Sequence, residues 1–224
     1  MTPAEERRPF SARQSPVGRG PAMAWDAVEL APVVLVAGAE HLLGERAVAG
    51  LIAAARARSA DVEVTRLEAA AYVGGTLTVV TSPSLFGEAR TVVVEGVEQA
   101  TDELVTDVLA YLDGPADDVV LVLVHGGGQR GKKLLDAVRA AGAPVVACDL
   151  IKKDADKVAF AVAELRRGDR RADVAAVRAL VEAVGADLRE LAAACAQLVA
   201  DTSGVIGAAA VARYYGGRIE ATGF

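Results

Sequence analysis

Val119-Val120-Leu121-Val122-Leu123-Val124-His125-Gly126-Gly127-Gly128 is the stretch that decides the fold. Its first six residues are apolar and mostly β-branched, and glycines follow directly. A short apolar run of this kind is typical of a strand that is buried on both faces, as strands of parallel sheets are. The stretch therefore predicts a central strand over 119–124 and a turn at the glycines.

Four other segments are predicted to lie beside this strand. Each is short and either apolar, alternating or rich in β-branched residues; they are 33–38, 61–67, 90–96 and 144–147. Helices are predicted between most of them, over 40–58, 101–112 and 132–141, the second opening at Thr101 as N-cap. This alternation predicts an α/β domain with a parallel sheet and helices on both faces.

Beyond Asp149 the pattern becomes purely helical. Apolar stripes predict helices with inward residues Ala155, Val158, Ala159, Val162 and Leu165, then Val174, Val177, Leu180, Val181 and Val184, then Leu188, Leu191, Cys195 and Leu198. Asp187 and Glu190 resemble a capping box at the start of the third helix. A fourth helix is predicted from Thr202 to Tyr215, ended by Gly216-Gly217.

The predicted domains are an α/β domain over 29–149 and a small helical domain over 150–224. Residues 1–28 are polar and rich in Pro and Gly, so a disordered tail is expected there, with order starting near Pro32. The sequence holds no apolar run long enough for a membrane span and no apolar signal segment. We therefore expect a cytoplasmic protein without a membrane partner.

Composition narrows the function classes. The net charge of −6 lacks the basic surplus of an autonomous nucleic-acid binder. The two cysteines, Cys148 and Cys195, match no metal-ligand spacing and are expected to be buried apolar residues. His41 and His125, the two histidines, form no recognisable catalytic set. No metal and no cofactor are therefore expected.

The turn after the first strand of the α/β domain is where a nucleotide-binding protein would hold phosphate. A P-loop requires Gly, four residues, then Gly-Lys-Ser/Thr. Here the sequence is Gly38-Ala39-Glu40-His41-Leu42-Leu43-Gly44-Glu45-Arg46, so the second glycine falls one position late and Glu45 replaces lysine. A Gly-x-Gly-x-x-Gly dinucleotide turn is also missing. The neighbouring strands end in His125-Gly126 and Glu95-Gly96, not in an acidic pair that could hold magnesium.

Two glycine- or arginine-rich segments leave alternatives open. Gly126-Gly127-Gly128 with Lys132 and Lys133 is either a phosphate loop or a plain strand-to-helix turn. The run 166–171 is either a DNA-backbone contact or a set of cations at a helix C-terminus.

Thr81-Ser82-Pro83-Ser84-Leu85-Phe86-Gly87 is the most informative loop. Proline fixes the turn, and Leu85 and Phe86 stand at its apex in a chain of which only 4% is aromatic. The two side chains either fold back onto the core or form an apolar wedge for a partner's pocket. As a wedge they would contribute on the order of 3–6 kcal/mol of burial before costs.

Taken together, several segments resemble the delta subunit of the bacterial DNA polymerase III clamp loader. They are Gly38–Leu43 without a Walker lysine, Ser84-Leu85-Phe86-Gly87-Glu88-Ala89-Arg90 running into Thr91–Val94, Lys132-Lys133-Leu134-Leu135, and Gly185-Ala186-Asp187-Leu188-Arg189. The resemblance spans about 32–224, and the Ala, Val, Arg and Gly content suggests an actinobacterial source.

The resemblance implies an AAA+-like parallel-sheet domain, a degenerate P-loop NTPase fold, followed by an all-helical lid domain. It implies a non-catalytic subunit of the polymerase holoenzyme that binds the sliding clamp (the beta subunit) and helps to open it. Leu85 and Phe86 carry this role, with Thr81, Ser82, Pro83 and Ser84 leading in; Thr81 stands where family members often have glutamine. Other loader subunits are implied partners, and primer-template DNA only within the assembled loader.

The family also has a third, collar domain that joins the loader subunits. This chain ends about where the collar would begin, so it is expected to be either a trimmed or a truncated form. A chain without the collar could bind the clamp yet fail to join a loader.

Overall fold

A computed structural model describes residues 22–82 and 87–221. The chain divides into two compact units, Met1–Leu150 and Ile151–Phe224. Each unit has its own buried apolar residues. The boundary falls within two residues of the place where strand patterns end in the sequence.

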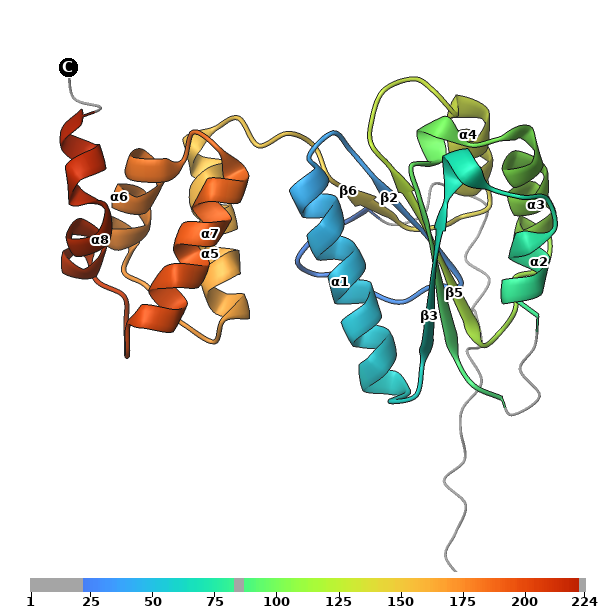
Figure 1. Cartoon of the computed structure of the whole chain (residues 1–224), viewed down its shortest axis with the longest axis horizontal. Helices are drawn as coiled ribbons and strands as arrows, with labels where there is room; N and C mark the ends of the chain where they lie inside the picture. The colour runs from blue at the N-terminus through green and yellow to red at the C-terminus, as the bar shows by residue number, and fades with distance from the viewer. Residues whose placement is uncertain (1–21, 83–86, 222–224) are drawn as a thin grey trace, which may run out of the picture. The chain divides into compact units, whose positions relative to one another are not determined.

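The first unit is built on a six-stranded sheet whose neighbouring strands are all parallel (Figure 1). Its order is β1-β6-β2-β5-β4-β3. The strands are β1 (Ala22–Met23), β2 (Val33–Ala37), β3 (Glu63–Glu68), β4 (Arg90–Glu95), β5 (Val119–His125) and β6 (Val145–Ala147). The predicted central strand is confirmed, since β5 lies between β2 and β4, with Leu35 opposite Leu123 and Val92 opposite Leu121.

Helices cover both faces of this sheet, as predicted. Figure 1 shows α1 on one face and α2, α3 and α4 on the other. They are α1 (His41–Arg58), α2 (Thr76–Val80), α3 (Asp102–Leu112) and α4 (Lys132–Ala140), with single turns η1 (Ala69–Ala71) and η2 (Val97–Gln99). Thr101 caps α3 by accepting a hydrogen bond from the Leu104 N–H at 3.3 Å.

The core explains why these segments become strands. Leu121 and Leu123 of β5 join Leu35 and Val92 in the apolar cluster under α2, α3 and α4, while Val122 is equally buried on the opposite face. A strand with two apolar faces is stable only between two helical layers, because each valine or leucine left exposed would forgo about 1.5–3 kcal/mol of stabilisation from burial.

Two features of this unit differ from the prediction. The sheet has a sixth strand, β1, inside the region 1–28 that was expected to be disordered, and Ala22 and Met23 pair with Val145 and Val146. Order thus begins well before Pro32, because the open edge of β6 offers backbone partners to a segment with little apolar pattern of its own. Helix α2 was not predicted either, since its sequence Thr-Leu-Thr-Val-Val is β-branched.

Over residues 151–221, the described part of the second unit, the chain forms four helices, α5 (Asp154–Arg167), α6 (Val174–Val184), α7 (Leu188–Asp201) and α8 (Ala208–Ala221). The predicted cap at Asp187 is present, since its Oδ1 accepts from the Glu190 N–H at 2.8 Å. In α5 the predicted inward residue Leu165 is buried, and Phe160 and Ala161, which were not predicted, are buried with it. Ala155 and Ala159 of the predicted stripe are exposed, and Val158 and Val162 are half-buried. Val174 is also exposed, not inward. Helix α8 begins after Thr202 and continues through Gly216-Gly217, which were predicted to end it.

The arginine-rich run 166–171 has a structural use in this unit. Arg166 and Arg167 lie in the last turn of α5, where cations interact favourably with the negative end of the helix dipole. Arg170 donates to the backbone oxygens of Val199 at 3.0 Å and Gly204 at 2.8 Å, so it ties the α5–α6 connection to the end of α7. These contacts favour the helix-terminus interpretation over a DNA contact.

No helix within residues 22–82 and 87–221 is both long and apolar enough to cross a membrane.

Cys148 and Cys195 are both buried, as predicted, with 1% of each residue exposed. Burial raises the pKa of Cys148 to about 11 and that of Cys195 to about 12, with nearby carboxylates adding to the effect. Both thiols therefore stay protonated at neutral pH and are poor nucleophiles.

We predict that neither thiol reacts with a thiol-specific reagent in the folded protein at neutral pH, and that both react after unfolding in guanidinium. With a reagent that releases a coloured group when it reacts with a thiol, the absorbance measures the number of reacted thiols. A thiol that reacts quickly in the folded state would contradict this assignment.

Candidate functional site

The turn between β2 and α1 lies at the carboxyl edge of the sheet, where an NTPase would hold phosphate. Gly38 makes this turn against the end of β6, and a Cβ atom at Gly38 would lie 2.0 Å from the Cys148 oxygen. The Gly38 N–H donates to the His125 oxygen at 3.1 Å, and the Glu40 N–H donates to the Cys148 oxygen at 2.8 Å. These two amides therefore donate their hydrogen bonds to the ends of neighbouring strands and not to a ligand.

The start of α1 carries its own anion. Glu40 is the N-cap residue, and its Oε1 accepts a hydrogen bond from the Leu42 N–H at 3.4 Å. A carboxylate thus occupies the position at a helix N-terminus that favours a phosphate. Gly44 and Glu45 lie inside α1, so the second glycine belongs to a helix and not to a phosphate-binding loop.

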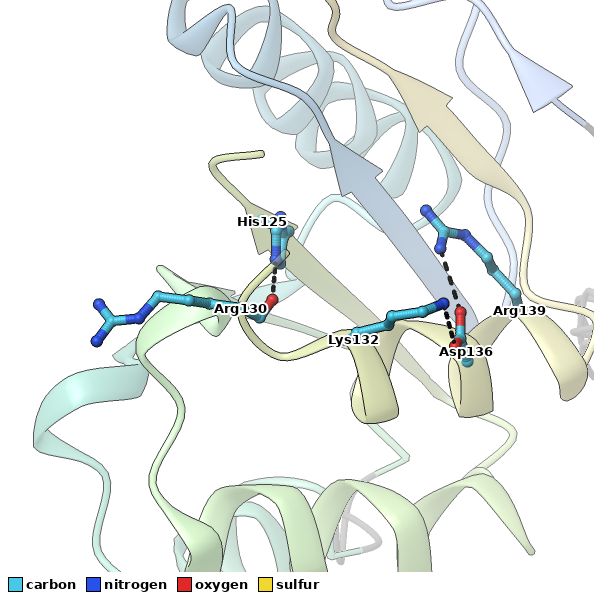
Figure 2. A network of polar contacts seen from close by, with 5 residues as sticks. All are labelled: His125, Arg130, Lys132, Asp136 and Arg139. Carbon is cyan, nitrogen blue, oxygen red and sulfur yellow. Dashed lines mark hydrogen bonds and ion pairs between the residues drawn. The ribbon is translucent and has the colours of Figure 1, made fainter. Parts of the chain in front are cut away.

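The loop between β5 and α4 is organised by His125, which is 2% exposed (Figure 2). Its Nδ1 accepts from the Gly127 N–H at 3.0 Å, so Nε2 carries the proton and donates to the Arg130 oxygen at 2.8 Å. The Gly126 N–H donates to Glu98 at 2.9 Å.

Lys132, which follows this loop, also has a partner within the chain. Lys132 pairs with Asp136 at 2.7 Å along α4, and Asp136 also faces Arg139 at 3.6 Å (Figure 2). The Gly126 and Gly127 amides and the Lys132 ammonium therefore have internal partners. This arrangement favours a strand-to-helix turn over a phosphate loop.

A cavity of 330 Å³ lies at the same carboxyl edge. Five glutamates line it, namely Glu40, Glu45, Glu68, Glu95 and Glu98. Its one arginine, Arg66, is paired with Glu95. Within the described ranges, no three His, Cys, Asp or Glu side chains come together in a way that could hold a metal ion. A triphosphate placed here would meet five carboxylates, and the one arginine in the lining already pairs with Glu95.

Alanine substitutions at Gly38, in the β2–α1 turn, and at Gly44, inside α1, test this geometry. We predict that Gly38→Ala destabilises the protein by about 1–3 kcal/mol, because the new methyl group overlaps the Cys148 carbonyl. Its matched control, Gly44→Ala, is expected to be neutral or stabilising by about 0.5–1 kcal/mol, since a Cβ there meets only Val36 at 3.9 Å within a helix. Urea unfolding measures both; equal losses would contradict this account.

Nucleotide binding gives a direct test of the acidic cavity. We predict that Mg²⁺-ATP leaves the melting temperature unchanged and gives no heat of binding in calorimetry. A ligand present at 100 times its Kd would add about 2.7 kcal/mol of stability, so the assay is sensitive. An ATP-binding protein under the same conditions is the control, and a saturable shift with this chain would reverse the conclusion.

The segment predicted to bind a clamp joins α2 to β4. Pro83, Ser84, Leu85 and Phe86 lie outside the described residues. The stem residues on either side are described.

Thr81 is 6% exposed, and its Oγ1 donates to the Leu77 oxygen at 2.8 Å. Ser82 is exposed, and its Oγ donates to the Thr78 oxygen at 2.6 Å. The Ser82 oxygen accepts from Arg90 Nη1, and Arg90 Nε is paired with Glu63 at 3.2 Å. Thr81, predicted as a polar lead-in to the partner, thus directs its hydroxyl into its own helix, and Ser82 is tied to the first residue of β4.

The opposite end of α2 is held by α3. Asp107 accepts from the Tyr72 hydroxyl at 2.6 Å and from the Gly75 N–H at 2.7 Å. The Tyr72 oxygen in turn accepts from the Leu77 N–H at 2.7 Å. Burial, with Asp107 adding to it, raises the pKa of Tyr72 to about 12, so the phenol stays protonated as a donor. Sequence reasoning missed this network, because its partners stand 35 residues apart and carry no motif.

The arrangement has relatives among solved structures. The DNA clamp loader delta protein of Bacillus subtilis matches with a TM-score of 0.61 and 18% identity, over 83% of this chain and 58% of that one. The RuvB Holliday junction branch migration motor of Thermotoga maritima matches with a TM-score of 0.50 and 12% identity, over 84% of this chain and 61% of that one.

The fold is AAA+-like. It consists of a parallel-sheet domain followed by a helical domain, as the sequence predicted. The chain spans less than two thirds of the length of either structure. No protein-family model matches the sequence, and no curated protein sequence matches it.

Proposed function

We propose that this chain is a clamp-loader delta-type subunit that binds the DNA sliding clamp and helps to open it during replication. The single observation that carries the proposal is the pairing of an AAA+ fold with a nucleotide position filled by the chain's own groups. An NTPase-type fold that lacks the groups for binding and hydrolysing a nucleotide is suited to binding a protein.

The filled nucleotide position supports a non-catalytic role. Glu40 caps the helix that would bind phosphate, and the cavity beside it is lined by glutamates. We therefore propose that the chain hydrolyses no ATP and that nucleotide acts elsewhere in a loader. No described contact favours the alternative of an active NTPase.

The sequence of the loop 81–87 supports the choice of partner. Leu85 and Phe86 match the apolar pair that the delta family inserts into the clamp, and Ser84 and Gly87 flank them as the family motif has it. The stem residues Ser82 and Arg90 are bonded to each other, which limits the freedom of the loop's ends and lowers the entropy cost of binding.

In the proposed mechanism, the α/β unit is a rigid platform and Leu85 and Phe86 enter an apolar pocket of the clamp. Binding opens the clamp only to the extent that the pair binds the open form more tightly than the closed form. Other loader subunits are proposed partners, and primer-template DNA is met within the assembly. The net charge of −6 supports a role without autonomous DNA binding.

We predict that the intact chain binds its cognate sliding clamp and that the Leu85→Ala, Phe86→Ala double variant binds at least about 100-fold more weakly, or roughly 2.8 kcal/mol. The reason is the loss of two apolar anchors from the centre of the interface. Surface plasmon resonance with immobilised clamp measures both affinities.

The control is Val174→Ala with Val205→Ala, which removes exposed apolar groups from the helical unit, where these valines are 63% and 61% exposed. It is expected to bind like the intact chain. Circular dichroism checks that each variant is folded. If the double variant at 85 and 86 binds as tightly as the intact chain, the proposal is wrong.

A further inference from the structure

A cavity of 510 Å³ lies in the helical unit, beside the connection between α5 and α6. A volume of this size is typical of sites that hold a small ligand or a few side chains of a partner. Three apolar residues and three arginines line it, namely Val162, Leu165, Ala172, Arg166, Arg170 and Arg171. Because no Asp or Glu is among these lining residues, the cavity combines an apolar wall with concentrated positive charge in a chain whose net charge is −6.

One of the three arginines is fixed by the fold. Arg170 Nε and Nη2 donate to the Gly204 oxygen at 3.1 and 2.8 Å, and Nη1 donates to the Val199 oxygen at 3.0 Å. Nη1 also donates to the backbone oxygen of Thr202, and Nη2 donates to its hydroxyl oxygen. These bonds use every N–H group of the guanidinium, so Arg170 supplies charge to the cavity but no further hydrogen bond.

The other two arginines keep their donors available. Arg166 and Arg171 are exposed, and neither side chain has a hydrogen bond or ion pair within residues 22–82 and 87–221. Their neighbour Arg167, by contrast, pairs with Glu164 at 3.3 Å. A guanidinium matches a carboxylate through two parallel hydrogen bonds, and these are stronger than bonds between neutral groups. An anionic group that enters the cavity therefore finds two arginines whose donors are not already in use.

The backbone around the cavity is held in place before any ligand arrives. The Arg170 N–H donates to the Leu165 oxygen at 3.0 Å, which closes the end of α5. The Ile206 N–H donates to the Arg171 oxygen at 2.9 Å, and Ala172 forms a parallel bridge with Ile206. A site preorganised in this way loses little conformational entropy on binding.

The surroundings favour a protein ligand over a nucleic acid. Asp169 and Asp173, both exposed, flank the Arg170–Arg171 pair in the sequence, so a phosphate backbone that runs beyond the cavity would meet carboxylates. Val174 and Val205, which are 63% and 61% exposed, add apolar surface next to the bridge at 172 and 206. Arginine together with apolar side chains is the composition of protein–protein interfaces, from which lysine is depleted.

We propose that this cavity binds an acidic segment of a partner protein, in which carboxylates stand beside large apolar side chains. Arg166 and Arg171 hold the carboxylates, and the fixed charge of Arg170 adds to the attraction. The half-buried Val162 and Ala172 receive an apolar side chain of the partner. The proposal does not depend on clamp binding, which is assigned to the other unit.

The test is isothermal titration calorimetry of the full chain with a short peptide in which aspartates alternate with leucine or phenylalanine. Saturable binding is expected, and Arg166→Gln with Arg171→Gln is expected to weaken it at least about tenfold, because both carboxylate partners are lost. The matched control is Lys152→Gln with Lys153→Gln, which removes the same charge from exposed positions at the other end of α5. This control is expected to leave the affinity within about twofold.

Two altered peptides separate the two parts of the site. Replacing aspartate by asparagine is expected to weaken binding at least about tenfold, and replacing the apolar residues by serine at least about threefold. Melting temperatures show whether each variant is folded. If the double variant loses stability through α5, Arg171→Gln alone serves in its place, since position 171 lies outside the helices.

The proposal is wrong if the aspartate peptide does not bind, or if the arginine and lysine variants lose affinity equally, since binding would then follow net charge and not the cavity. A single-stranded oligonucleotide that binds more tightly than the peptide, and loses affinity when Arg166 and Arg171 are replaced, would assign the cavity to nucleic acid and overturn the proposal as well.

Discussion

The burial of β5 on both faces is the constraint on which the rest of the structure depends. A strand of valine and leucine without a polar face needs a parallel strand on each side and a helical layer above and below. Parallel strands require crossover helices, so the carboxyl ends of all the strands lie at the same edge of the sheet. This places the β2–α1 turn, the β5–α4 loop and the end of β6 together at the carboxyl edge.

At that edge the chain uses its own groups where an active NTPase would keep groups free for nucleotide. Glu40 caps α1, Glu98 holds the Gly126 amide, and the buried ring of His125 fixes the loop before α4. The same fold leaves α2 at a different place, between β3 and β4, attached through Tyr72, Leu77 and Asp107. The nucleotide position is thereby occupied by the chain's own groups, while α2 is attached to the core by Leu77 and to α3 by Asp107.

Much of this could be predicted from local pattern. The apolar run 119–124, the glycine after β2 and the missing lysine at position 45 predicted the sheet, the turn and an altered phosphate site. The strand β1 could not be predicted, because Ala22 and Met23 are strand residues only through the open edge of β6. Helix α2 has β-branched residues and exists because Asp107, distant in sequence, binds its start. The inward turn of the Thr81 hydroxyl follows from α2 and was missed with it.

Hydrogen exchange measured by mass spectrometry, with and without the cognate sliding clamp, tests the central proposal most directly, namely that the α/β unit binds the clamp through the loop after α2 and not through its nucleotide edge. The account predicts slower exchange on clamp binding for amides over 73–90, and unchanged exchange at Gly38 and over 125–131. Protection at the β2–α1 turn and the β5–α4 loop, with 73–90 unaffected, would contradict it.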